Sequence, residues 1–124
     1  MERGRYMDFR KIRGQSGESI ALAYLEERGF RLIERNWNCR LGEIDLIVER
    51  GGETRFVEVK LRRTMEYGYP EASITRTKLR HLSRAIECWM NDQARPPICY
   101  QADAIAIFAP LGEEPEITWI EGIF

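Results

Sequence analysis

The sequence has few of the residues that build disulfide frameworks or zinc sites. Its three cysteines, Cys39, Cys88 and Cys99, are widely spaced in a chain of 124 residues that contains a single histidine, His81. Disulfide scaffolds and structural zinc sites need paired or closely spaced Cys and His ligands, so neither is expected. We expect three free thiols, buried or half-buried.

Long apolar runs are missing as well. No segment approaches the roughly 20 apolar residues of a membrane-spanning helix, and the N-terminus lacks the apolar core of a signal peptide. Hydrophobic residues make up 44% and charged residues 31%, which is typical of a folded chain rather than a disordered one. We therefore expect one cytoplasmic domain with its own core and no membrane contact.

Basic residues are absent from the last part of the chain, because no Lys or Arg follows Arg95. The N-terminal stretch instead carries Arg3, Arg5, Arg10, Lys11 and Arg13. This asymmetry allows a nucleic-acid surface without requiring one, and the pI near 5.9 counts mildly against tight non-specific DNA binding. We expect residues 1–13 to form a basic arm and residues 14–124 to form the domain. The arm either contacts phosphate or is a frayed end, and we favour the frayed end.

The most informative pattern is a hairpin formed by residues 42–48 and 56–61. Both segments alternate apolar and polar residues, as strands do when one face lies on a core. On the first strand Ile44, Leu46 and Val48 fall on one face. The hairpin is therefore expected to lie against the core.

A turn at Gly51-Gly52 fixes the register of this hairpin, placing Asp45 opposite Glu58 and Glu43 opposite Lys60. Directly opposed residues have Cβ atoms roughly 5 Å apart, and like charges there are destabilising. A divalent cation between Asp45 and Glu58 would offset the repulsion. The alternative is a solvent-facing hairpin in which Glu43 simply pairs with Lys60.

Oxygen ligands without a His or Cys cluster suit a hard cation, so the expected cofactor is Mg²⁺ or Mn²⁺. Such ions usually act on phosphate groups, and Lys60 would then lie near the attacking water or the developing charge. Glu18, in the first turn of a helix expected over residues 16–28, is a candidate third ligand. Its alternative role is a favourable interaction with the helix dipole.

The remaining elements complete an α/β (α+β) fold. Strands are expected at residues 30–37, 100–108 and 116–120, and a long helix at residues 75–92. The order α-β-β-β-α-β-β predicts a central mixed five-stranded sheet flanked by helices.

Basic side chains follow the hairpin. Arg62 and Arg63 open a loop that also contains Tyr67 and Tyr69, and Arg76 and Lys78 begin the long helix. Arginines among aromatic residues suit a phosphate backbone with exposed bases, so the four basic residues are candidate nucleic-acid contacts. A solvated loop and a solvated helix face are the alternatives.

Asp45, followed on a paired strand by Glu58-Val59-Lys60, resembles the PD-(D/E)xK motif of restriction-endonuclease-like nucleases. The chain is also similar to the YraN family of small uncharacterised bacterial proteins, which are themselves similar to archaeal Holliday junction resolvases. The resemblance covers most of the chain: Gly17-Glu18, residues 42–47, residues 56–60 with Arg62, Lys78, Asp103 and residues 119–124. Where the family usually shows Arg-Phe-Asp before the late strand, this chain has Gln101-Ala102-Asp103.

The resemblance implies a restriction-endonuclease-like core in which Glu18, Asp45 and Glu58 hold the metal and Lys60 is the catalytic lysine. We expect a metal-dependent endonuclease or phosphodiesterase that acts on DNA, with branched or damaged DNA among the candidate substrates. A homodimer is compatible with this activity, because relatives that cut junctions must cut two strands. The alternatives are a nucleic-acid-binding module that keeps the fold without cleavage, and a protein-interaction role in which residues 120–124 dock on a partner.

Overall fold

The structure, a computed structural model, describes residues 2–5 and 16–124. Its elements are β1 (Glu2–Arg5), α2 (Gly17–Glu27), β2 (Arg31–Cys39), β3 (Gly42–Arg50), β4 (Glu53–Arg62), the 3₁₀ helix η1 (Pro70–Ser73), α3 (Arg76–Asp92), β5 (Cys99–Phe108) and β6 (Glu116–Ile120). Every helix and strand expected from the sequence is present, and β1 and η1 are additional. No helix in the described residues is long and apolar enough to cross a membrane.

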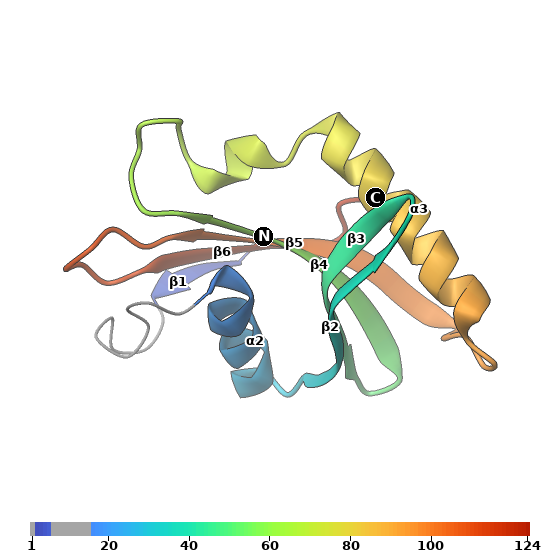
Figure 1. Ribbon diagram of the computed structural model, residues 1–124. Coiled ribbons are helices and arrows are strands. Elements are labelled where there is room, and N and C mark those ends of the chain that lie inside the picture. The colour runs from blue at the N-terminus through green and yellow to red at the C-terminus, as the bar shows by residue number, and fades with distance from the viewer. Residues whose placement is uncertain (1, 6–15) are drawn as a thin grey trace.

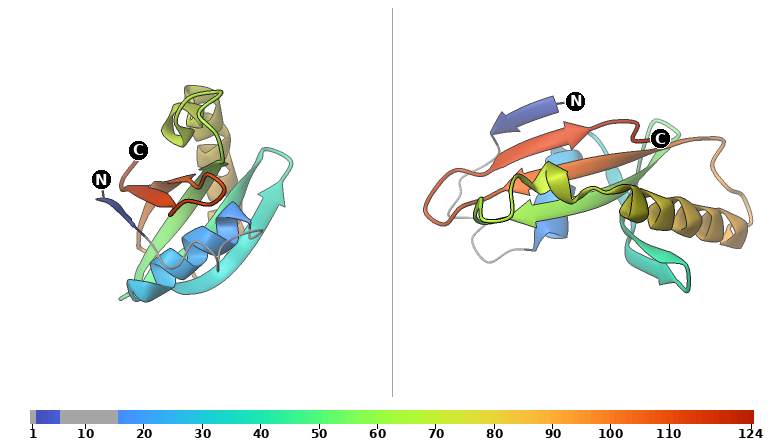
Figure 2. Two further views of the ribbon diagram at one scale, coloured as in Figure 1. Left: turned by 90° about the vertical axis from the view of Figure 1, so that its left-hand side faces the viewer. Right: turned by 90° about the horizontal axis from the view of Figure 1, so that it is seen from above.

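The strands form one mixed sheet in the order β1-β6-β5-β4-β3-β2. Among the strands of residues 2–5 and 16–124, only the neighbours β4 and β5 run parallel, and η1 and α3 supply the crossover that a parallel pair requires. The expected α+β fold with its five-stranded mixed core is confirmed. β1 extends the sheet beyond β6 (Figure 2), so residues 2–5 of the expected arm are paired rather than frayed. Residues 6–13 lie outside the described residues, and a phosphate contact there stays a prediction.

The helix α2 covers one face of the sheet (Figure 1). Its N-terminus is capped by the Ser16 hydroxyl, which accepts a hydrogen bond from the Ser19 N–H at 3.2 Å. The chain leaves the helix at Gly29, whose φ of 91° suits glycine. The helix buries apolar residues against β3, β4, β5 and β6, in a cluster that includes Ile20, Tyr24, Leu25, Leu46, Val48, Val57, Val59, Ile105, Ile117 and Trp119.

The helix α3 packs against the opposite face (Figure 1). Thr75 caps it, and Leu82, Ala85, Ile86 and Trp89 are buried along its length. They form a second cluster with residues of the sheet, Ile44, Ile47, Phe56 and Ala102. Both faces of the sheet are therefore covered, and the two clusters lie on opposite sides of it.

Ile44 does not share a face with Leu46 and Val48, so that prediction is wrong. Leu46 and Val48 pack under α2, whereas Ile44 packs with α3. The regular pairing of β3 with β4 ends at Leu46 and Val57, and the two-residue alternation that predicts a common face holds only along a regular strand.

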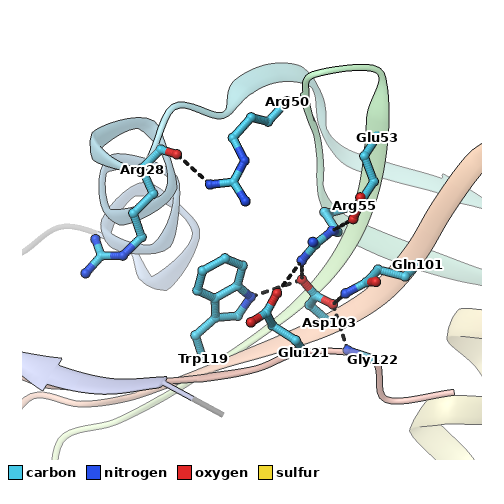
Figure 3. Close-up of polar contacts among 9 residues, drawn as sticks. All are labelled: Arg28, Arg50, Glu53, Arg55, Gln101, Asp103, Trp119, Glu121 and Gly122. Atoms are coloured by element: carbon cyan, nitrogen blue, oxygen red, sulfur yellow. Dashed lines mark hydrogen bonds and ion pairs between the residues drawn. The ribbon is translucent and has the colours of Figure 1, made fainter.

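An ion and hydrogen-bond network around Arg55 and Asp103 joins β4, β5 and β6 (Figure 3). The Arg55 Nη1 atom lies 2.7 Å from Asp103 Oδ2 and 2.9 Å from Glu121 Oε1. Asp103 is fully buried and also accepts hydrogen bonds from the Trp119 indole at 3.0 Å and from the Gly122 N–H at 2.9 Å. The late-strand acid Asp103 therefore anchors Arg55 and the C-terminal end of the chain.

This network makes a stability prediction. Asp103→Ala leaves the buried Arg55 guanidinium without its main partner, and we expect it to lower the free energy of unfolding by about 3–5 kcal/mol. The matched control is Glu53→Ala, which removes an Arg55 partner that is 41% exposed and should cost less than about 1 kcal/mol. Urea denaturation measures both, and equal losses in the two variants would contradict this account.

Candidate active site

The candidate site lies where β3 leaves β4. Regular pairing ends at Leu46 and Val57, immediately before the level of Asp45 and Glu58. On β2, Asn36 stands at this same level with a φ of 52°, a conformation that residues other than glycine rarely adopt. The β2–β3 hairpin therefore turns out of the sheet toward α3 (Figure 1, Figure 2).

The carboxylate of Asp45 occupies the gap between the diverging strands. Its Oδ2 atom accepts a hydrogen bond at 2.8 Å from the N–H of Val59 on β4. The Asp45 side chain therefore takes the place of the backbone carbonyl that would accept this hydrogen bond in a regular β ladder. Burial raises the pKa of Asp45, and the charges of Glu18 and Glu43 raise it further. The Val59 hydrogen bond and Lys60 oppose this rise without cancelling it.

Glu58 lies beside Asp45. Burial, followed by the charge of Asp45, raises the pKa of Glu58 to about 7, although Lys60 and Lys78 act in the opposite direction. The two carboxyl groups thus repel each other in a partly desolvated position. The proximity expected from the hairpin register is confirmed, although the ladder itself stops one pair earlier.

Two lysines face these carboxylates. Lys60 follows Glu58 by two residues on β4, and Lys78 approaches from the first turn of α3. Burial lowers the pKa of Lys60, and the adjacent Lys78 lowers it further. The helix dipole disfavours a cation in the first turn of α3, yet Lys78 stands there, and its charge lowers the pKa of Glu58.

The site thus gathers Asp45, Glu58 and Lys60, whose charges act on one another, together with Glu43 and Lys78, whereas the charge of Glu18 acts on Asp45 from α2. No ion pair joins Glu43 to Lys60, both of which the structure describes. The three expected metal ligands are less closely gathered than a preformed metal cage. Within residues 2–5 and 16–124, no three His, Cys, Asp or Glu side chains lie close enough together to hold a metal ion.

The four basic residues expected to contact nucleic acid have different environments. Arg62 donates from Nη2 to the Ser73 hydroxyl at 2.6 Å, and Arg63 donates from Nη1 to the Ala109 carbonyl at 3.1 Å, so both brace the loop after β4. The buried Nε of Arg62 has no hydrogen-bond partner among the described atoms. Arg76 is exposed at the start of α3, whereas Lys78 belongs to the site itself.

A pocket of about 460 Å³ opens beside Glu58, between the end of the β2–β3 hairpin and α3. Its lining is Asn38, Cys39, Arg40, Leu41, Gly42, Glu43, Glu58, Lys78, His81 and Leu82. Sequence reasoning did not place Asn38, Arg40 or His81 near the site, because they reach it only through the docking of the hairpin on α3. Gly42 was the available signal, since a glycine inside a strand often marks a close backbone approach.

The sequence matches the model of a family described as "Uncharacterised protein family UPF0102" over residues 17–107. The chain belongs to this family. Among similar UPF0102 proteins, one from Caldicellulosiruptor saccharolyticus is 39% identical over 101 residues, covering 82% of this chain and 86% of the relative. One from Geobacter sulfurreducens is 40% identical over 114 residues, covering 92% and 89%, and one from Leifsonia xyli is 42% identical over 110 residues, covering 89% and 93%.

Membership in this uncharacterised family leaves the resemblance to restriction-endonuclease-like nucleases a prediction. The matched segment begins at Gly17 and therefore includes Glu18, the hairpin residues Asp45, Glu58 and Lys60, and Lys78. The whole candidate site of this UPF0102 chain lies within the family-defining region.

The raised pKa of Glu58 predicts a pH-dependent effect on stability in metal-free protein. The folded chain keeps the Glu58 proton up to about pH 7, whereas the unfolded chain releases it near pH 4.5, so this group destabilises the fold as pH rises through that window. We expect Glu58→Gln to raise the free energy of unfolding by about 1–2 kcal/mol at pH 8, after discounting for partial exposure, and by much less at pH 5.

Glu49→Gln is the control, because its effect on stability should have the opposite dependence on pH. The Gly52 N–H and Arg31 lower the pKa of Glu49, so its contribution is present at pH 8 and is lost as the carboxylate is protonated at low pH. Thermal denaturation in EDTA from pH 4 to pH 8 measures both variants. A Glu58→Gln variant whose stability tracks the unsubstituted protein at every pH would contradict the account.

Proposed function

We propose that this protein is a divalent-metal-dependent nuclease, an endonuclease or related phosphodiesterase acting on DNA. The observation that carries the proposal is the proximity of the Asp45 and Glu58 carboxyl groups at the point where β3 and β4 separate, with Lys60 and Lys78 acting on Glu58. Resemblance to the PD-(D/E)xK motif supports the same assignment. Family membership is neutral, because UPF0102 is uncharacterised.

The chemistry of the site fits Mg²⁺ or Mn²⁺. Burial and mutual repulsion disfavour ionisation of both carboxyl groups, and a cation between them would relieve the second of these costs. The donors are oxygen atoms, which hard cations prefer. Mg²⁺ is usually held by one or two carboxylates together with water and substrate phosphate, so a preformed cage of three carboxylates is not required.

In this proposal Asp45 and Glu58 hold the ion and Glu18 assists from α2. A bound ion of this kind polarises a phosphoryl oxygen and lowers the pKa of a water molecule. The Val59 N–H fixes the orientation of the Asp45 carboxylate, leaving its second oxygen for the ion. Lys60 donates hydrogen bonds that position the attacking water or stabilise the charge that develops on the phosphate.

Several features favour a nucleic acid as the substrate. Lys78 adds a cation at the site, and Arg76 is exposed at the start of the same helix. The loop after β4 presents Tyr67 and Tyr69, which are 76% and 54% exposed and suited to stacking on bases. A homodimer that cuts two strands stays a prediction.

The second candidate function is a nucleic-acid-binding module without cleavage. It is favoured by the finding that no three potential metal ligands gather among the described residues. A protein-interaction role through residues 120–124 has less support, because Ile123 packs beside α3 and donates its N–H to the Ala102 carbonyl at 2.8 Å. Only Phe124 at this end remains a large exposed apolar residue.

Cleavage assays test the proposal. End-labelled linear duplex, single-stranded, nicked, splayed and four-way DNA are incubated with Mn²⁺ or Mg²⁺. We expect cleavage of at least one substrate that requires the metal and falls by about 10²-fold or more in Asp45→Asn and in Lys60→Ala, because each removes a group acting on the reacting phosphate.

The matched control is Arg31→Ala, which removes a basic side chain that pairs with Glu49 at the other end of the hairpin and should leave cleavage unchanged. Lack of cleavage on every substrate would overturn the nuclease proposal. Salt-sensitive DNA binding that is retained in Asp45→Asn, without cleavage, would establish the binding module instead.

A further inference from the structure

The pocket beside Glu58 has the dimensions and chemistry of a ligand site. Its volume of about 460 Å³ falls within the range of roughly 300–1,000 Å³ that small-molecule sites occupy. The proposed metal site explains two of the lining residues, Glu58 and Lys78. It does not explain the other lining side chains, Asn38, Arg40, Leu41 and His81.

We propose that this pocket binds one unpaired nucleobase of the substrate strand, next to the phosphate that is cut. The inference rests on the proposed function for its position, because the pocket shares Glu58 and Lys78 with the candidate active site. It adds a substrate class, which is DNA with an unpaired or easily extruded nucleotide at the site of cleavage.

The lining groups match the functional groups of a base. The Asn38 amide, whose Nδ2 also donates to the Asn36 carbonyl at 3.4 Å, keeps a second N–H donor and its oxygen acceptor for a base. Arg40 offers guanidinium donors for base carbonyl and ring nitrogen atoms. Glu43 is an acceptor suited to an exocyclic amine, the group that carboxylates read on cytosine. A ligand with donors and acceptors on one planar edge satisfies all three.

The apolar lining suits the faces of a base. Leu41, which is half exposed, and Leu82, which is buried, both belong to the lining and offer apolar surface to a planar ring. The imidazole of His81 adds a flat surface of the kind on which bases stack in single-strand binding sites. Lys78, which is also in the lining, would then contact the backbone phosphate of the same nucleotide.

The β2–β3 hairpin meets α3 in a close backbone contact at one of the lining residues, Gly42. A Cβ atom added to Gly42 would lie 2.5 Å from the carbonyl oxygen of His81, so only glycine lets the hairpin approach α3 this closely. The hairpin and the helix therefore hold Asn38, Arg40 and His81 in fixed relation to Glu58.

A base inside a matched duplex is stacked and paired, and it reaches such a pocket only by extrusion. Extrusion costs a few kcal/mol and is cheapest for mismatched, damaged or single-stranded positions. The pocket would therefore select for unpaired nucleotides beside the cleavage site, independently of how the remaining DNA is held.

A binding experiment without metal tests the pocket separately from cleavage. The full chain, in EDTA, is titrated by NMR with each of the four 5′-phosphorylated homotrinucleotides and with an analogue whose central nucleotide lacks its base. We expect at least one homotrinucleotide to shift the amides of residues 38–43 and 81–82, and to bind about tenfold more tightly than the abasic analogue.

Asn38→Leu and the matched control Asn91→Leu complete the design. Both asparagines are exposed, so neither substitution should unfold the chain, and Asn91 lies near the far end of α3. We expect Asn38→Leu to weaken trinucleotide binding about fivefold or more and Asn91→Leu to leave it unchanged, since one hydrogen bond contributes about 1 kcal/mol.

Equal affinity for the homotrinucleotides and the abasic analogue would overturn the inference, as would Asn38→Leu binding like the unsubstituted protein. The titration contains no metal and no cleavage step, so its result can be interpreted even if the protein cuts no DNA. Conversely, if the protein cleaves DNA but the pocket amides shift equally with and without the central base, the base-binding inference fails and the nuclease proposal stands.

Discussion

The hydrogen bond from the Val59 N–H to the Asp45 carboxylate connects the fold of this chain to its candidate site. It lets β3 separate from β4 without leaving a buried backbone donor unpaired, and that separation sends the β2–β3 hairpin toward α3. The same bond holds Asp45 beside Glu58, where burial and repulsion raise the pKa of both groups. The docked hairpin then forms the pocket with the first turns of α3. The Asp45 side chain therefore contributes to the separation of the strands, to the raised pKa of Glu58 and, through the docked hairpin, to the pocket.

The two ends of β4 have different roles. Near its start, Arg55 is neutralised by Asp103 and Glu121, so a buried charge is fully compensated within the protein. Near its end, Asp45, Glu58 and Lys60 remain incompletely compensated, and the pKa values of all three are shifted from their ordinary values. Perturbed titration beside a pocket is typical of functional sites, whereas a closed ion network is typical of structural ones. This contrast within one strand is the physical basis for placing function at the end where β3 diverges.

Much of this arrangement could be predicted from the sequence, because it depends on local pattern. The Gly51-Gly52 turn and two-residue alternation predicted the hairpin, and the register brought Asp45 to Glu58. The sequence did not predict the divergence at Asp45, because a side chain replacing a strand partner leaves no periodic signal; Ile44 was consequently assigned to the wrong face. Arg55 was overlooked, although a charged residue between Thr54 and Phe56 in a buried strand was a usable sign of a partner such as Asp103. Asn38, Arg40 and His81 depend on the docking of the hairpin on α3, a tertiary contact that no local pattern encodes.

The central claim is that the carboxylate pair on the diverging strands exists to hold a divalent cation. Isothermal titration of the metal-free protein with Mn²⁺ at pH 8, where Glu58 is ionised, tests it most directly. The account predicts one Mn²⁺ site per chain, weakened at least about tenfold in Asp45→Asn and unchanged in Glu49→Gln, which neutralises a carboxylate elsewhere on β3. Absence of Mn²⁺ binding, or equal binding by the protein and its Asp45→Asn variant, would contradict it.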